Sequence, residues 1–171
     1  RHLYAIWDIY INYVDAPPPW SLPPITFTNE DFKEINHVNQ DDPMMVSLIM
    51  GNFKVLKVLI DQGSSADILY WKTFQKLEVS PYMIHPYPRL LLGFAGEKVE
   101  TRGYIDLMTT FGQGSLLRSF TIKYLIVDVH TSLSCFDWAE GLNELGAIFS
   151  KPHIKMKFLT TTGEIVTVKA Y

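Results

Sequence analysis

Two apolar runs rich in branched side chains, Met45–Met50 and Phe53–Ile60, are separated only by Gly51-Asn52. A two-residue turn between strands needs positive backbone φ angles, which glycine and asparagine adopt at low cost. The pattern therefore predicts a β-hairpin, in which the two runs are neighbouring antiparallel strands.

Most of the remaining chain shows short strand patterns divided by turn residues. Arg118–Val129 alternates between apolar and polar side chains and is predicted to be a strand. The other expected elements are a second hairpin of Arg89–Phe94 and Lys98–Phe111 around Ala95-Gly96-Glu97, a turn at Gly112-Gln113-Gly114, strands at Ile154–Phe158 and Glu164–Lys169 around Thr162-Gly163, helices at Tyr70–Leu77 and Gly141–Leu145, and a proline-rich loop over Ser80–Arg89. The chain is thus predicted to be mainly β, without the strand–helix alternation of a parallel sheet.

Composition divides the chain into three segments. Residues 1–24 are rich in aromatic residues and proline, and we expect either a short amphipathic helix or a poorly ordered leader, followed by an extended linker. Residues 25–43 form a polar, acidic lead-in, in which Thr28–Asp31 is typical of a helix cap. Residues 44–171 carry the strand patterns of one domain, and the start at Arg1 indicates a piece of a longer chain.

The composition argues against several classes of function. The net charge of −3 and the lack of a basic cluster disfavour nucleic-acid binding by this domain, and no apolar run is long enough to span a membrane. Cys135 is the only cysteine, which excludes an internal disulfide and favours an intracellular, cytoplasmic location. The five histidines lack the paired spacing of a metal site, so neither a metal nor a cofactor is expected.

The strongest candidate for chemistry is Asp61, which follows the apolar run Val58–Ile60. A carboxylate at the end of a buried strand is partly desolvated, and this raises its proton affinity. Two such carboxylates that face each other share one proton, so one can activate a water while the other protonates a carbonyl oxygen. An Asp-x-Gly triplet alone is more often a simple β-turn. Asp67 is expected either at a substrate subsite or at a helix cap or the surface, whereas Asp106 and Asp128 are expected in solvent.

Three stretches together, Val58–Tyr70, Leu92–Glu97 and Thr101–Leu107, resemble the aspartic protease segment of plant Ty3/gypsy-type retrotransposon polyproteins, which is retropepsin-like. The match continues through Thr131-Ser132, Leu142-Asn143, Leu145–Ile148 and Pro152–Phe158. It covers approximately residues 25–169, and the segments around Asp61 and Arg102-Gly103-Tyr104 are the most specific.

The resemblance implies a mainly β fold: a retropepsin-like, closed antiparallel β barrel with one or two short helices and one Asp-x-Gly loop per chain. It also implies a homodimer, because a dyad requires Asp61 from two copies. Gln62, Gly63 and Ser64 would support the loop, and Gly93, Phe94, Ala95 and Gly96 would form a flap over an extended peptide or polyprotein substrate.

Two positions depart from the family pattern. Gln62 stands where threonine or serine is usual, and Trp138 stands about where a glycine lets a strand pass close behind the catalytic loop. A buried indole in a glycine-sized gap costs about 1–3 kcal/mol as overpacking, so we expect the Phe136–Glu140 segment to bulge outward. Two hypotheses follow: an active homodimeric endopeptidase, or a catalytically impaired relic that serves as a dimerising or peptide-binding module.

Overall fold

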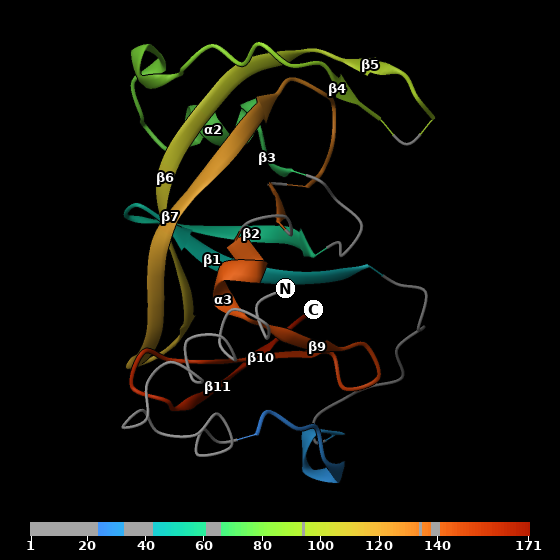
Figure 1. Cartoon of the computed structure of the whole chain (residues 1–171), viewed down its shortest axis with the longest axis vertical. Helices are drawn as coiled ribbons and strands as arrows, with labels where there is room; N and C mark the ends of the chain where they lie inside the picture. Colours follow the sequence, from blue (N-terminus) through green and yellow to red (C-terminus); the bar gives the residue numbers. More distant parts are fainter. Residues whose placement is uncertain (1–23, 33–42, 61–65, 94, 134, 138–140) are drawn as a thin grey trace, which may run out of the picture.

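The computed structural model describes residues 24–32, 43–60, 66–93, 95–133, 135–137 and 141–171, and these are mainly β-strands (Figure 1). The strands are β1 (Met44–Met50), β2 (Phe53–Ile60), β3 (Asp67–Tyr70), β4 (Leu91–Leu92), β5 (Lys98–Val99), β6 (Thr101–Gln113), β7 (Leu116–Val127), β8 (Cys135–Asp137), β9 (Ile148–Ser150), β10 (Lys155–Leu159) and β11 (Ile165–Lys169). The helical elements are α2 (Trp71–Lys76), α3 (Gly141–Leu145) and the 3-10 turns η2 (Asn29–Phe32) and η3 (Pro81–Met83). The predicted mainly β class with short helices is therefore confirmed. Among the described residues, no helix has the length and apolar character needed to cross a membrane.

Six strands pair in the order β1-β2-β8-β3-β7-β6, and we call this group the six-strand sheet. The predicted first hairpin is confirmed, with Met50 opposite Phe53 across the turn. β6 and β7 form the longest pair, and β6 also pairs with β1 at Ile49↔Thr110 and Met50↔Thr109. The turn between β6 and β7 lies later than predicted, because β6 continues through Gln113, which pairs with Leu116.

Most of the strand pairs are antiparallel, but two pairs are parallel, and the sequence did not predict these two. β8 pairs in parallel with β2, and β7 pairs in parallel with β3. β8 also pairs antiparallel with β3, so it lies between β2 and β3. A local alternation of apolar and polar residues identifies a strand, but it carries no information about a pairing partner as distant in sequence as Cys135 is from Val58.

The core of the six-strand sheet is formed by residues that alternate along its strands. In β7, Ile122, Tyr124 and Ile126 are buried, as the alternation predicts. The hydroxyl of Tyr124 lies 2.9 Å from the hydroxyl oxygen of Thr109, which is also buried. The Thr109 hydroxyl also lies 3.2 Å from the Leu107 carbonyl oxygen, to which it donates, so these buried polar groups are hydrogen-bonded.

A second sheet has the order β11-β10-β9, and the lead-in packs against it. The Lys157 ammonium on β10 lies 2.9 Å from the carbonyl oxygen of Thr26 and 2.9 Å from the Asp31 carboxylate. Both charged side chains are only 11% exposed. The rings of Phe27 and Phe32 contact His153, just before β10. Residues 24–32 are thus held against the C-terminal part of the chain by a shielded ion pair and by aromatic packing.

The docking of the lead-in should depend on acid pH through Asp31. The Thr28 N–H, which donates to the Asp31 carboxylate at 2.8 Å, and the Lys157 ammonium hold the pKa of Asp31 below its usual value of 3.8. Because a lowered folded-state pKa favours the ionised form, its stabilising effect is complete above about pH 4 and is lost as the pH falls through the folded pKa. The protection of the Thr28 amide, measured from pH 6 to pH 2 relative to the intrinsic exchange rate at each pH, should therefore decrease only below about pH 4. Asp31→Asn should abolish that transition, and an identical transition in this variant would contradict the assignment.

Candidate active site

The segment that carries Asp61 is framed by three adjacent strands. β2 ends at Ile60 and β3 begins at Asp67, with β8 between them. Ile60 lies opposite Asp137 in the parallel β2–β8 pair, while Ile68 lies opposite Phe136 in the antiparallel β3–β8 pair. Residues 61–66 therefore connect two strands that are both hydrogen-bonded to β8. Val58 and Leu69, on either side of this connection, are fully buried.

The four loop residues predicted from the sequence, Asp61, Gln62, Gly63 and Ser64, lie outside the described residues. The structure describes the residues on either side of this loop, Ile60 and Ala66, and the strands β2 and β3 that lead into and out of it. Asp61 directly follows Ile60, the last residue of a strand that is paired on both edges. The predicted position of Asp61, at the end of an apolar strand in the sheet, is consistent with this frame.

Asp67 is buried, with 2% of its surface exposed, at the start of β3. The expectation of a surface position is therefore wrong. The expectation of a helix cap is also wrong, because the N-cap residue of α2 is Tyr70 and no side chain caps this helix. In the β3–β7 pair, Asp67 lies opposite Tyr124. A buried carboxylate thus stands six positions after Asp61, on the strand that receives the chain from the loop.

Two other carboxylates lie on the surface, as expected. Asp106 is exposed on β6. Asp128 follows β7, where its carboxylate accepts a hydrogen bond of 2.6 Å from the Arg102 guanidinium. Both side chains of this pair are about half exposed (46% and 53%), so the pair contributes little to stability.

The segment expected to bulge outward is a regular strand over its first part. Residues 135–137 form β8 and pair with both β2 and β3. The expected displacement is therefore wrong for these residues, since two flanking strands supply main-chain partners that hold them in the sheet. Trp138, the position that departs most from the family pattern, lies outside the described residues.

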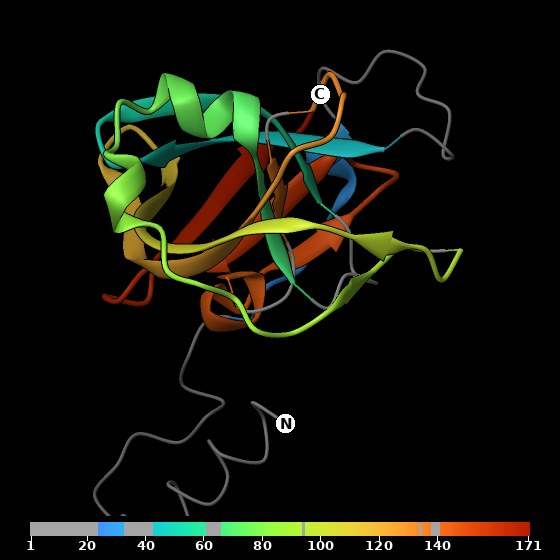
Figure 2. The same cartoon turned by 90° about the horizontal axis from the view of Figure 1, so that it is seen from above.

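The predicted second hairpin is present as β4 and β5, which extend away from the body of the molecule (Figures 1 and 2). It is shorter than predicted, because the chain from Thr101 onward forms β6, which pairs with β7. The turn is closed by the Gly93 N–H, which donates to the Glu97 carbonyl at 2.9 Å, and by the Gly96 N–H, which donates to the Gly93 carbonyl at 3.0 Å. Gly96 has φ of +78°, a conformation that favours glycine. The Glu97 carboxylate accepts from the Ala95 N–H at 2.9 Å. Phe94 lies outside the described residues.

The motif Arg102-Gly103-Tyr104 fastens the start of β6, a role that the sequence did not reveal. His85 and Tyr104 exchange two backbone hydrogen bonds of 2.8 and 2.9 Å. The Arg102 guanidinium lies 4.0 Å from the centre of the Trp71 ring, at the start of α2. These contacts tie the base of the β4–β5 hairpin to the helix that follows β3.

The described residues contain no group of three His, Cys, Asp or Glu side chains arranged to hold a metal ion. A cavity of about 560 Å³ lies at the other end of β2, around Lys54, and is not part of the frame of Asp61. The candidate active site therefore consists of the β2–β8–β3 frame and the β4–β5 hairpin.

Comparison with known proteins supports the fold. No protein-family model matches the chain, and no curated protein matches it significantly. Among solved structures, the retroviral protease-like domain of Ddi1 from Leishmania major aligns with a TM-score of 0.57 at 9% identity, over 79% of this chain and 95% of that chain.

Two further structures align less closely. The EIAV protease in complex with the inhibitor HBY-793 gives a TM-score of 0.48 at 18% identity, over 67% of this chain and 99% of that chain. A retropepsin-like aspartic protease from Rickettsia conorii gives 0.47 at 16% identity, over 77% of this chain and 87% of that chain. The alignment with the Ddi1 domain shows that the chain is similar in fold to a retroviral protease-like domain.

Proposed function

We propose that this chain is the protease domain of a retropepsin-like aspartic endopeptidase that acts as a homodimer. The observation that carries the proposal is the β2–β8–β3 frame, in which Ile60, the last residue of β2, is paired with both β1 and β8 and stands immediately before Asp61. The similarity in fold to the Ddi1 domain supports it. In this proposal the six-strand sheet closes into the barrel typical of retropepsins.

The proposed chemistry uses two carboxylates and one water. Asp61 from each copy meets its counterpart at the dimer axis, and the two share one proton because both cannot ionise at close range. The ionised carboxylate removes a proton from the water, which attacks the scissile carbonyl, while the protonated carboxyl stabilises the developing oxyanion. Gln62, Gly63 and Ser64 brace the two loops.

The β4–β5 hairpin would act as the flap in this proposal. Its main-chain groups would pair with an extended peptide, as strands add to an open sheet edge. The Ala95 N–H is held by Glu97 in the free protein, so binding through that N–H requires an exchange of acceptors. The polyprotein of a plant Ty3/gypsy-type retrotransposon is the proposed substrate, in an intracellular setting, with residues 44–171 as the protease domain.

The second candidate is a peptide-binding or dimerising relic without turnover. The observation in its favour is the pair of departures at Gln62 and Trp138. A relic would keep the fold and the capacity to pair, but it would bind a peptide without cleaving it.

The two candidates are separated by assaying the purified chain on a peptide library at pH 4–6, with and without a statine-type transition-state inhibitor. An active enzyme should cleave extended peptides, lose activity with the inhibitor and sediment as a dimer at the assay concentration. Inhibitor binding without cleavage would support the relic, and the absence of both cleavage and inhibitor binding would refute the peptidase proposal.

A further inference from the structure

The pairing of β1 with β2 is interrupted shortly before the candidate site. Val46 lies opposite Val58, and Leu48 lies opposite Val55. Two steps along β1 therefore correspond to three steps along β2. The extra residue forms a β-bulge around Lys57, the residue before Val58.

This bulge decides which side chains of β2 face the core. Side chains alternate along a regular strand, so residues three positions apart point to opposite faces. Val55 and Val58 are nevertheless both buried, with 5% and 0% of their surface exposed. The extra residue between them makes this possible, because it shifts the alternation by one position. Without it, Val58 would face solvent, and the pairing of Val58–Ile60 with β1 and β8 would move by one residue.

The bulge depends on a backbone conformation that is unfavourable for lysine. Lys57 has φ of +59°, in the left-handed region that favours glycine. A strained residue persists only where its surroundings hold it in place. The side chain of Lys57 is exposed, and that of the neighbouring Leu56 is 51% exposed. Packing of these two side chains therefore contributes little to the bulge.

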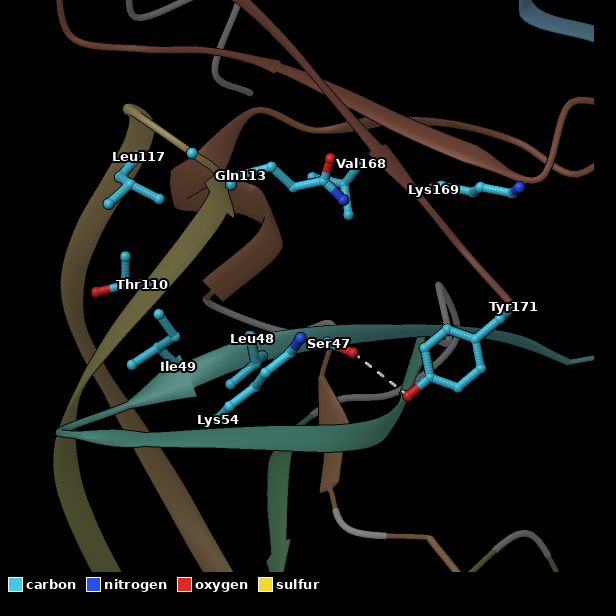
Figure 3. A pocket seen from close by; sticks show the side chains of 12 residues that line it. Ser47, Leu48, Ile49, Lys54, Thr110, Gln113, Leu117, Val168, Lys169 and Tyr171 are labelled. Atoms are coloured by element: carbon cyan, nitrogen blue, oxygen red, sulfur yellow. Dashed lines mark hydrogen bonds between the residues drawn. The ribbon is translucent and has the colours of Figure 1, made fainter. Parts of the chain in front are cut away.

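Tyr171, which follows β11, bridges the two strands at the bulge. Its hydroxyl accepts a hydrogen bond of 2.6 Å from the Lys57 N–H on β2. It also accepts one of 3.4 Å from the hydroxyl of Ser47 on β1, which is the dashed line in Figure 3. The backbone of Tyr171 is itself fixed, because its N–H donates to the Met45 carbonyl at 2.9 Å and the preceding Ala170 is buried.

From these contacts we infer that Tyr171 is a positioning residue for the end of β2. Its hydroxyl takes the place of a ladder partner for the Lys57 N–H and so keeps the extra residue of β2 in the bulge. The bulge in turn fixes the face and the register of Val58–Ile60, which lead directly into Asp61. The catalytic role of Asp61 rests on the proposed function, but the effect of Tyr171 on the register does not.

The first test is amide hydrogen exchange in the whole chain, followed residue by residue by NMR. Tyr171→Phe removes one oxygen and keeps the ring. Exchange at Lys57 should accelerate about fivefold or more, and the protected amides of Val58–Ile60 should accelerate about threefold or more. Those of Phe53–Val55, before the bulge, should keep their rates. Tyr82→Phe is the matched control, because Tyr82 is 99% exposed on η3, and it should change no rate.

A second substitution separates the hydrogen bond from the strain that it offsets. Lys57→Gly removes the steric cost of the left-handed conformation. The double variant Lys57→Gly/Tyr171→Phe should therefore recover the original exchange rates at Val58–Ile60. Lys57→Asn tolerates the same conformation and repeats this rescue with a side chain present.

Kinetics then test the consequence for catalysis. In a chain that cleaves peptides, Tyr171→Phe should lower kcat about tenfold and leave KM within about twofold, because a misplaced group affects the chemical step more than binding. The double variant Lys57→Gly/Tyr171→Phe should restore kcat, and Tyr82→Phe should leave it unchanged. An unchanged kcat in Tyr171→Phe would overturn the role of Tyr171 in positioning Asp61.

The exchange experiment decides about Tyr171 even if the chain cleaves no peptide, a result that would count against the peptidase proposal alone. The inference is overturned if Tyr171→Phe leaves exchange at Lys57 unchanged. It is also overturned if the amides on both sides of the bulge accelerate equally, if neither substitution of Lys57 restores the rates, or if Tyr82→Phe has the same effect.

Discussion

Replacing Asp61 with asparagine should lower kcat/KM for peptide cleavage by about 10²–10⁴-fold, because an amide can neither accept the proton of the attacking water nor return one. Asparagine has nearly the same shape as aspartate, so the fold should persist. The measurement is hydrolysis of a cleavable peptide at pH 4–6, beside thermal unfolding of both proteins. Equal rates in the two proteins would refute the catalytic assignment.

The same variant tests whether two copies of Asp61 form one site. If each site needs both, an exchanging equal mixture of original and Asp61→Asn chains should retain about one quarter of the activity, because only dimers with two original copies are complete. If each chain works alone, one half should remain. Asp106→Asn is the matched control, since this aspartate is exposed on β6 and lies outside the proposed site. Loss of activity in Asp106→Asn would show that the assay responds to fold or net charge instead.

The local elements of this fold are predictable from the sequence because their causes are local. The β1–β2 hairpin follows from Gly51-Asn52 between two apolar runs, and α3 was predicted at Gly141–Leu145, where the structure has it. The position of β8 between β2 and β3 depends on contacts between distant segments. No periodicity records such a pairing, so the two parallel pairs were missed.

The lead-in illustrates the same limit. The turn near Thr28–Asp31 was predictable from its capping residues, and it is present as η2. Its attachment through Lys157 was not, because that residue lies 126 positions from Asp31 and a lone lysine in a strand ordinarily reads as solvent-exposed. Only the folded chain shows that the two charges meet in a shielded place.

The parts of the candidate site that form short sequence motifs could be predicted from the sequence. The sequence located the Asp61 segment and the β4–β5 hairpin, but it assigned Asp67 to a surface or cap position as readily as to a subsite. The sequence around Asp67 does not show that it is buried, because its burial depends on the strands beside it. In the structure β3 lies between β7 and β8. The cavity around Lys54 was not predicted from the sequence, because four separate parts of the chain form it.

Replacing Gly103 with alanine should destabilise the domain by about 3–5 kcal/mol, a large share of the stability of an ordinary domain. Gly103 has φ of +117°, which alanine adopts only with strain. A Cβ at this position would also overlap the carbonyl oxygen of His85. That carbonyl accepts from the Tyr104 N–H at 2.9 Å, so it cannot move without breaking the bridge to β6. Urea unfolding followed by far-ultraviolet circular dichroism gives the free energy difference.

Gly51→Ala separates backbone strain from overlap at Gly103. Gly51 also has a positive φ, of +58°, but nothing lies within 4 Å of a Cβ built on it. This variant should therefore lose only about 1 kcal/mol, the cost of a left-handed conformation in alanine. If the two variants lose equal stability, the close approach of β6 to His85 does not contribute to the cost of replacing Gly103. If Gly103→Ala loses far more, the Arg102-Gly103-Tyr104 motif is explained by backbone packing at the base of the hairpin, independently of any catalytic role.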